Sequence, residues 1–198
     1  MSPITKMGAE TEKSSRRTRA DSLRNRERLV TAAARVFGAG GRGAKLDAVA
    51  REAGVGIGTL YRHFPTREAL FEAVYRSEVD QLFALAERLA NEAPPVEALR
   101  QWLHANIHLM TTKKGMVEAL QLVAYGSTEL KAYSFQRLTD GLALLLDRGA
   151  RSGELRDDIT AEELLRTMVG IFYADGPQDW QASALRVIDI LIDGLQRR

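Results

Sequence analysis

Two of the three histidines, His104 and His108, stand four residues apart, which places them on one face of a helix. This is the spacing of a helical metal-binding pair, but the metalloprotease motif also needs a Glu directly after the first His, where the chain has Ala105. The chain contains no Cys, and the third histidine, His63, lies in a different segment. We therefore expect no metal and no cofactor. We interpret the pair as polar residues in the wall of a helical pocket, with plain packing as the default alternative.

Other sequence patterns that usually carry catalysis are missing. There is no G-x-S-x-G motif and no obvious acid–base pair of side chains. The glycine-rich stretch 38–43 lacks the Lys-Ser/Thr of a phosphate-binding loop, and it follows a helical pattern instead of a strand. We therefore expect that the protein is not an enzyme.

The stretch 45–67 has the pattern of two short helices joined by a turn. Gly54 marks the end of the first helix, because Gly adopts a positive φ at no steric cost. Leu60 and Phe64, four residues apart, give the second helix an apolar inner face. Thr66 then predicts the N-cap of a third helix. Two short helices around a Gly-containing turn make a helix-turn-helix, a motif whose second helix usually enters the major groove of DNA.

The sequence AVAREAGVGIGTLYRHFPTREAL, at 48–70, resembles the DNA-binding signature of the TetR/AcrR family of bacterial transcriptional regulators. The preceding helix also fits, because it ends in an aromatic residue and a Gly-rich loop. The matching positions are Val49, Ala50, Ala53, Gly54, Val55, Gly58, Thr59, Leu60, Tyr61, Phe64, Arg67 and Leu70.

The resemblance implies DNA contacts from the start and the end of the second short helix. In the family these positions lie in the major groove, and here they are Gly56, Ile57, Gly58, Thr59, Arg62 and His63. Thr59 could hydrogen-bond a base or a phosphate, and Ile57 could touch a thymine methyl group.

The resemblance also implies contacts to the DNA backbone. Tyr61 matches the family Tyr whose hydroxyl meets a phosphate, with core packing beside Phe64 as the alternative. Arg67 stands where the family usually has a Lys bonded to the backbone. Lys45 and Gly56 replace common Ser or Thr residues at the starts of the two short helices. Both departures remove hydroxyl caps, and they leave the pattern of contacts open.

Charge is unevenly distributed along the chain. Residues 1–67 hold 14 Lys and Arg against 6 Asp and Glu, whereas residues 68–198 hold 14 against 20. A basic segment that contains a helix-turn-helix, followed by an acidic remainder, is typical of a DNA-binding head on a different kind of body. A solvated charged face is the alternative explanation for the charge alone.

The chain divides into three segments by pattern. Residues 1–20 are polar and end in a basic cluster, which predicts a disordered arm that either follows DNA or is dispensable. The resemblance implies that residues 21–67 form the helix-turn-helix DNA-binding domain and that residues 68–198 form a ligand-binding and dimerisation domain. A long fourth helix from 66 to about 90 joins the two domains.

The fold class is all-α, with about nine helices, because no segment shows a sustained strand alternation. Beyond the fourth helix we expect five more, at 95–112, 115–125, 128–151, 160–173 and 180–196, with breaks at Gly and Pro clusters. The run at 113–120 is similar to the ligand domain of the family subgroup typified by the regulator SbtR.

Aromatic, Met and polar residues of the acidic body could line a ligand cavity. Ordinary core packing is an equally weighted alternative for these residues. The candidate ligand-binding residues are Phe83, Trp102, His104, Asn106, His108, Met110, Met116, Tyr125, Phe135 and Phe172.

The last two helices carry apolar stripes that cover much of their circumference. Such helices must be buried, either by a second copy of the chain or within the monomer. The candidate dimer-interface residues are Leu165, Met168, Val169, Phe172, Leu185, Ile188, Leu191 and Ile192.

These patterns predict a homodimeric transcriptional regulator, most simply a repressor of a palindromic double-stranded DNA operator that a small-molecule effector releases. The alternative is an effector-independent DNA-binding factor, architectural or controlled by a partner. No apolar run is long enough to cross a membrane, and no signal peptide is evident, so we expect a cytoplasmic protein without a membrane partner.

Overall fold

The computed structural model describes the backbone at 4–40, 45–120, 127–173 and 180–197, and side chains at 19–39, 45–117, 127–171 and 181–197. The described residues form helices and no strands, which confirms the all-α prediction. The eight helices are α1 (Ile4–Gly40), α2 (Leu46–Glu52), α3 (Ile57–His63), α4 (Arg67–Glu92), α5 (Pro95–Leu120), α6 (Thr128–Ser152), α7 (Ala161–Tyr173) and α8 (Trp180–Leu195).

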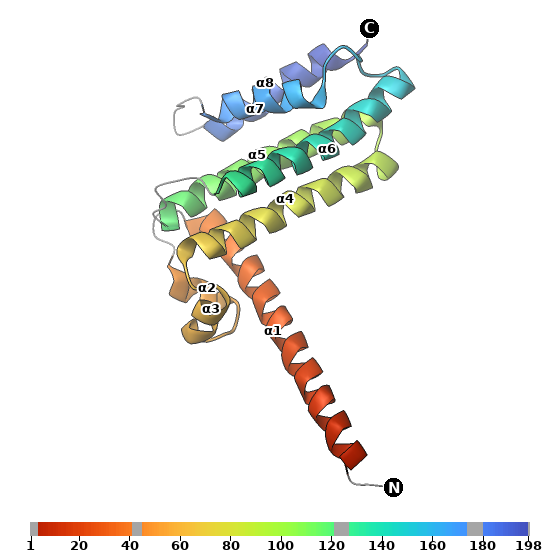
Figure 1. The fold of residues 1–198 in the computed structure, drawn as a ribbon. Helices are drawn as coiled ribbons and strands as arrows, with labels where there is room; N and C mark the ends of the chain where they lie inside the picture. Colours follow the sequence, from red (N-terminus) through yellow and green to blue (C-terminus); the bar gives the residue numbers. More distant parts are fainter. Residues whose placement is uncertain (1–3, 41–44, 121–126, 174–179, 198) are drawn as a thin grey trace.

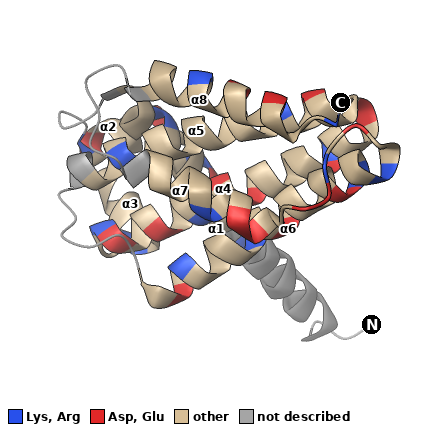
Figure 2. Cartoon of the chain, turned by 90° about the horizontal axis from the view of Figure 1, so that it is seen from above, with Lys and Arg blue, Asp and Glu red and all other residues tan. Residues whose placement is uncertain are grey.

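The helices form a small head, α1–α3, and a larger body, α4–α8. In the body, α4 packs against both α5 and α6, while α8 lies on α5 and α7 lies on α6 (Figure 1). The view from above shows α8 beside α5 again (Figure 2), and Figure 1 shows α8 on the side of the body away from the head. The last part of α1 packs against α5 as well as against α2 and α4. The head therefore rests on two helices of the body, not on α4 alone.

The described residues form eight helices where the sequence predicts about nine, because α5 continues through Gly115. The sequence prediction of a helix break at Gly115 is wrong for a steric reason. A Cβ built at Gly115 would lie 2.7 Å from the carbonyl oxygen of Phe37 in α1. The glycine permits two helices to approach closely. At the N-terminus, the sequence predicts a disordered arm at 1–20. In the structure α1 begins at Ile4, so most of that segment is helical.

Several helix ends follow their sequence signals. The Thr66 hydroxyl accepts a hydrogen bond from the Ala69 N–H at 3.1 Å, so Thr66 is the predicted N-cap of α4. Ser127 caps α6 in the same way, through the N–H of Leu130. Gly153 ends α6 with a φ of 78°, in the left-handed region that favours glycine.

One apolar core runs from the head into the body. It begins with Leu29 and Phe37 of α1 and continues through the inner faces of α4, α5 and α6 to Ile192 of α8. Trp102 lies in this core, fully buried, and its indole N–H donates a hydrogen bond to the Leu82 carbonyl at 2.8 Å. None of the described helices has the length and hydropathy needed to cross a bilayer.

Candidate nucleic-acid interface

The turn between α2 and α3 is held by backbone hydrogen bonds. Gly54 has a φ of 65°, as the sequence predicts for the end of the first short helix. The Val55 N–H donates to the Ala50 carbonyl at 2.9 Å, which closes the turn. Lys45 and Gly56 are the N-caps of α2 and α3, and neither helix start has a side-chain cap. Both short helices therefore begin without the hydroxyl caps that are common in the family.

The short helix α3 has two distinct faces. Leu60 and Phe64 are 1% and 2% exposed and fix the inner face of α3 in the head. Ile57 and Tyr61, again four residues apart, are 38% and 50% exposed on the outer face. Tyr61 therefore lies outside the core, and the alternative of core packing beside Phe64 does not describe it. A large apolar residue and a tyrosine face solvent together on a basic head.

Arg62 folds back along α3. Its guanidinium donates to the Gly58 carbonyl and to the Thr59 hydroxyl, both at 3.3 Å. The Thr59 hydroxyl accepts this bond and keeps its own proton to donate. His63 follows, with its ring 6.4 Å from the ring of Phe64. Arg67, the first residue of α4, is exposed immediately after the Thr66 cap.

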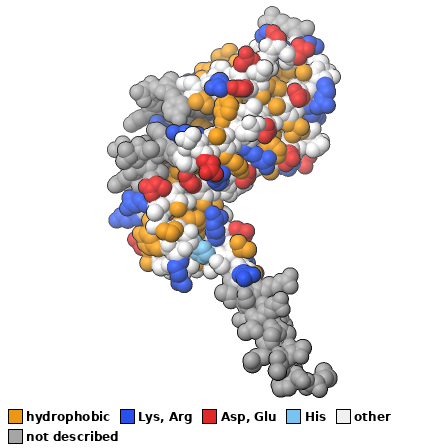
Figure 3. Space-filling view, viewed as in Figure 1, with side chains coloured by type: hydrophobic (Ala, Val, Ile, Leu, Met, Phe, Trp, Pro, Cys, Tyr) orange, Lys and Arg blue, Asp and Glu red, His pale blue; other side chains and the backbone are white. Residues whose placement is uncertain are grey.

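Arginines of α1 contact the helix-turn-helix motif. The Arg28 guanidinium lies over the turn, where a Cβ at Gly54 would be 2.6 Å from it. Arg35 pairs with Glu52 of α2 at 3.3 Å, and Arg26 lies 5.2 Å from the ring centre of Phe64. On the face shown in Figure 3, Lys and Arg side chains surround the head. The sequence does not reveal these contacts of the arginines with the motif, since helical periodicity does not show which helix lies opposite.

The candidate ligand residues lie in several different parts of the body and do not line one cavity among the described residues. Trp102 and Met116 are buried in the core. Phe83 lies beneath the Arg137 guanidinium at 3.5 Å, and the Phe135 ring lies 5.0 Å from the guanidinium of Arg166. Met110 is partly buried beside the core. Tyr125 and the side chain of Phe172 lie outside the described residues.

Asn106 is the candidate ligand residue with unmet hydrogen-bonding capacity. Its side chain is 1% exposed, and neither its amide nitrogen nor its amide oxygen has a partner among the described residues. The Thr139 hydroxyl in α6 is also buried without a described partner. Buried polar groups normally have a hydrogen-bond partner, because leaving them unpaired costs about 1–3 kcal/mol. Among the described residues of the body, Asn106 therefore has the largest unmet hydrogen-bonding capacity, with two unpaired polar atoms.

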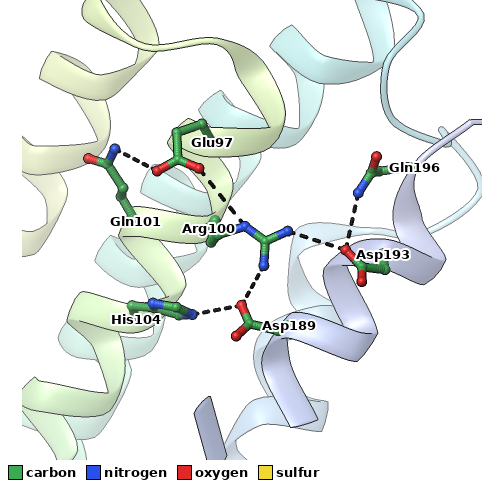
Figure 4. Close-up of polar contacts among 7 residues, drawn as sticks. All are labelled: Glu97, Arg100, Gln101, His104, Asp189, Asp193 and Gln196. Atoms are coloured by element: carbon green, nitrogen blue, oxygen red, sulfur yellow. Dashed lines mark hydrogen bonds and ion pairs between the residues drawn. The ribbon is translucent and has the colours of Figure 1, made fainter. Parts of the chain in front are cut away.

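His104 faces α8 instead of a pocket. Its Nε2 lies 2.9 Å from Asp189 Oδ1, and Arg100 binds both Asp189 and Asp193 (Figure 4). Burial raises the pKa of Asp189, but the hydrogen bonds with His104 and Arg100 outweigh it and lower the pKa below its ordinary value. The signal for this contact is present in the sequence, because each helix carries its partners four residues apart. The pairing of α5 with α8 is what the sequence does not show.

His108 is exposed and lies near Glu78 of α4. Burial raises the pKa of Glu78, and the nearby His108 partly opposes this shift. The two histidines of α5 therefore meet different neighbours, one on α8 and one on α4.

Half of the candidate dimer residues are covered within a single chain. Leu165, Met168, Ile188 and Ile192 are 0–2% exposed and pack into the core of one protomer. A covered side chain has no surface to give to a partner, so these four residues support the outer face of α7 and α8 from beneath. Val169, Leu185 and Leu191 are partly exposed, whereas the exposed large apolar residues of α8 are Val187 and Ile190, at 45% and 72%.

Comparison with known proteins agrees with this geometry. Residues 29–74 match the bacterial regulatory proteins of the tetR family, and residues 94–197 match the C-terminal domain of SbtR-like transcriptional regulators. An exposed helix-turn-helix on a helical body defines the protein as a DNA-binding transcriptional regulator. More specifically, the chain belongs to the TetR family, with an SbtR-like C-terminal domain.

Similar structures include the TetR transcriptional regulator SCO0520 from Streptomyces coelicolor, at 43% identity and a TM-score of 0.73, which covers 86% of this chain and 98% of that one. A TetR transcription regulatory protein from Mycobacterium vanbaalenii is 30% identical, with a TM-score of 0.70 over 91% of this chain and 99% of that one. The HTH-type transcriptional regulator SAR0097 from Staphylococcus aureus is 34% identical over 83 residues, which span 41% of this chain and 44% of that protein.

Proposed function

We propose that the protein is a homodimeric repressor that binds a palindromic operator through α3 and is released from it by a small-molecule effector. The observation that carries the DNA-binding mode is the outer face of α3. Ile57 and Tyr61 are exposed there, while Leu60 and Phe64 hold the inner face in the core. An apolar side chain suits a thymine methyl group and a tyrosine hydroxyl suits a phosphate, so the two contacts supply base readout and positioning.

A dimer follows from the outer face of the last two helices. Val187, Ile190, Leu191 and Gly194 fall at i, i+3, i+4 and i+7 of α8, which is the spacing of one helix face. Ile190 is 72% exposed, and a Cβ at Gly194 would meet nothing within 4 Å. A second copy of α8 would cover this face and pair two heads. Two heads related by a two-fold axis read two half-sites about one helical turn apart, or a multiple of it.

Effector release requires that a ligand change the position of the head. Asn106 in α5 offers an amide donor and acceptor inside the body, so we propose an effector with a polar group that bonds to it. The same helix carries Gly115, where α5 meets the end of α1. A ligand that shifts α5 would move the head relative to the body. The distance between the two α3 helices of the dimer would then no longer match the distance between the half-sites. Such a protein represses by occupying its operator, since bound protein excludes other proteins from the same DNA.

The first test is selection of operator sequences from genomic fragments with the purified full-length protein. We expect a palindromic sequence to be enriched and footprinting to show two protected half-sites. If no sequence is enriched over random DNA, sequence-specific binding is wrong. Small molecules are then screened for release of the selected operator. By reciprocity, the operator must weaken effector binding by the factor by which the effector weakens operator binding.

A matched pair of variants tests the effector site. Met110→Trp enlarges a side chain one turn from Asn106, so it should block the proposed site and abolish release while leaving operator affinity intact. Leu144→Trp on α6 is a control at a partly buried position in a separate open depression at the far end of α4 and α6. If Met110→Trp keeps full release by a verified effector, the site lies elsewhere in the body.

A further inference from the structure

The basic residues of α1 follow a regular spacing. Lys and Arg occur at positions 6, 13, 17, 24, 28 and 35, in steps that alternate between seven and four residues. Two such steps make 11 residues, which is three turns at about 3.67 residues per turn and close to the 3.6 of an α-helix. Because α1 is helical from Ile4 to Gly40, these six positions lie along one side of it. We call them the basic stripe. Glu10 lies on the same side, between Lys6 and Lys13, and Asp21 lies at the edge of the stripe.

The basic stripe ends beside the helix-turn-helix. Arg24, Arg28 and Arg35 line a shallow depression together with Glu52 and Ala53 of α2. Arg28 covers the turn at Gly54. The side chains of Arg24 and Arg35 are each 66% exposed even though they pair with Asp21 and Glu52. Exposed pairs of this kind contribute little, typically below about 1 kcal/mol, so both arginines remain able to exchange a carboxylate for a phosphate.

The other end of the stripe extends beyond the head. In Figure 1 the N-terminal half of α1 projects past α2 and α3, on the side of the head opposite the body. At 1.5 Å per residue, positions 6 to 28 span about 33 Å, which is close to one helical turn of B-DNA. Double-stranded DNA carries one negative charge per about 1.7 Å of its axis, so a straight row of cations of this length is complementary in charge to a row of DNA phosphates.

We propose that the basic stripe is a second DNA-binding element, which contacts phosphates outside the base pairs that α3 reads. The proposal rests on the DNA binding by α3 proposed above. The stripe adds affinity and fixes the angle at which α1 approaches the duplex, and it adds no base readout. Its charge complementarity, its continuity with the helix-turn-helix and its projection away from the body all favour DNA as the partner.

The test compares two double variants that remove the same charge. Lys13→Ala with Arg17→Ala removes two members of the basic stripe. Arg16→Ala with Arg19→Ala removes two cations of the same segment that lie off the stripe. Lys, Arg and Ala are all good helix formers, so both variants keep the helix. The probe is a duplex that carries the selected operator and extends one helical turn beyond it on each side, measured over a range of salt concentrations.

We expect the stripe variant to reduce the magnitude of the slope of log K against log salt by about 3.6, because the dimer loses two phosphate contacts from each protomer and each lost contact removes about 0.9. Hydroxyl-radical footprinting should show loss of protection outside the half-sites with protection of the half-sites retained. The control variant should keep the wild-type slope and footprint. Equal losses in the two variants, or a wild-type footprint for the stripe variant, would overturn the proposal. Failure of the wild type itself to select an operator would instead overturn the proposed function.

Discussion

The carbonyl oxygen of Phe37, near the end of α1, lies so close to Gly115 in α5 that a Cβ at position 115 would be 2.7 Å from it. The next residue of α1, Gly38, lies close to Thr112, which is about one turn before Gly115 in α5. A Cβ built at Gly38 would be 3.7 Å from the Thr112 Oγ1. The head and the body therefore touch backbone to backbone at this point. Backbone contacts adjust less readily than side chains, so we expect a displacement of α5 in the body to move α1 in the head.

Gly115→Ala should separate these helices. We expect the free energy of unfolding to fall by about 1–3 kcal/mol, the usual cost of overpacking, measured by urea denaturation. Gly170→Ala in α7 is the control, since its Cβ would meet nothing within 4 Å. There the gain in helix propensity should raise stability by about 0.5–1 kcal/mol. A Gly115→Ala protein as stable as the Gly170→Ala protein would contradict the close approach of α1 and α5.

Asn106→Leu exchanges a buried amide for an apolar side chain of similar size. Because the amide has no described partner, the substitution should raise the free energy of unfolding of the ligand-free protein, by about 1–3 kcal/mol. The same variant should lose its response to the effector. Asn91→Leu is the control, because Asn91 is exposed and donates to the Glu87 carbonyl at 2.7 Å. A lower stability for Asn106→Leu would mean that the amide is satisfied in the free protein.

Ile190→Glu should break the proposed dimer. The substitution would place an unpaired charge in an apolar interface, at a residue that is 72% exposed in one protomer and therefore harmless to its core. Sedimentation at micromolar concentration should show monomers for the variant and dimers for the wild type. Leu23→Glu, at a 63% exposed position of α1, should leave the dimer intact. A monomeric wild type would rule out the dimer altogether.

Thr59→Ala should reduce discrimination between bases by about 1–3 kcal/mol at one position of the operator. Tyr61→Phe should weaken all sequences similarly, because a phosphate contact carries no base information. Thr59 also accepts a hydrogen bond from Arg62, so a double-mutant cycle between the two should show coupling. Affinities for all single-base variants of the selected operator provide the measurement. Equal effects of Thr59→Ala at every base would remove it from the base-reading residues.

Asp189 should make the α5–α8 contact sensitive to acid. Its pKa lies below the ordinary 3.8, so its ionised form stabilises the fold above pH 4. That contribution disappears as the pH falls through the lowered pKa. The difference in urea midpoint between wild type and Asp189→Asn should therefore be largest near neutral pH and shrink below about pH 4. Asp147→Asn, at an exposed position of α6, is the control. A pH-independent difference would exclude this electrostatic role.

The long helices and the helix-turn-helix were predictable because their signals are local. Periodic apolar residues, the Thr66 cap and the positive φ of Gly54 each act within a few residues of the chain. Gly115 misled the prediction because a glycine marks either a helix end or a close approach, and only the neighbouring helix decides which.

The proposed dimer interface and the contact between α5 and α8 were less predictable from the sequence pattern alone. Periodicity identifies Ile188 and Ile192 as buried positions, but it does not say whether their cover is the same chain or a second copy. Likewise, the pairing of Arg100 with Asp189 depends on α8 lying on α5. Both depend on tertiary arrangement, which the order of residues along one helix does not contain.

The close contact between Phe37 and Gly115 also limits how such regulators are recombined. The DNA-binding head is not a self-contained module here, since its first helix packs on a helix of the body. A chimera that joins this head to another body through α4 alone would bring any larger residue at position 115 against the Phe37 carbonyl. A chimera that exchanges operator specificity between relatives therefore needs a glycine at the position of Gly115 in the recipient body. Otherwise, only the residues on the outer face of α3 should be exchanged.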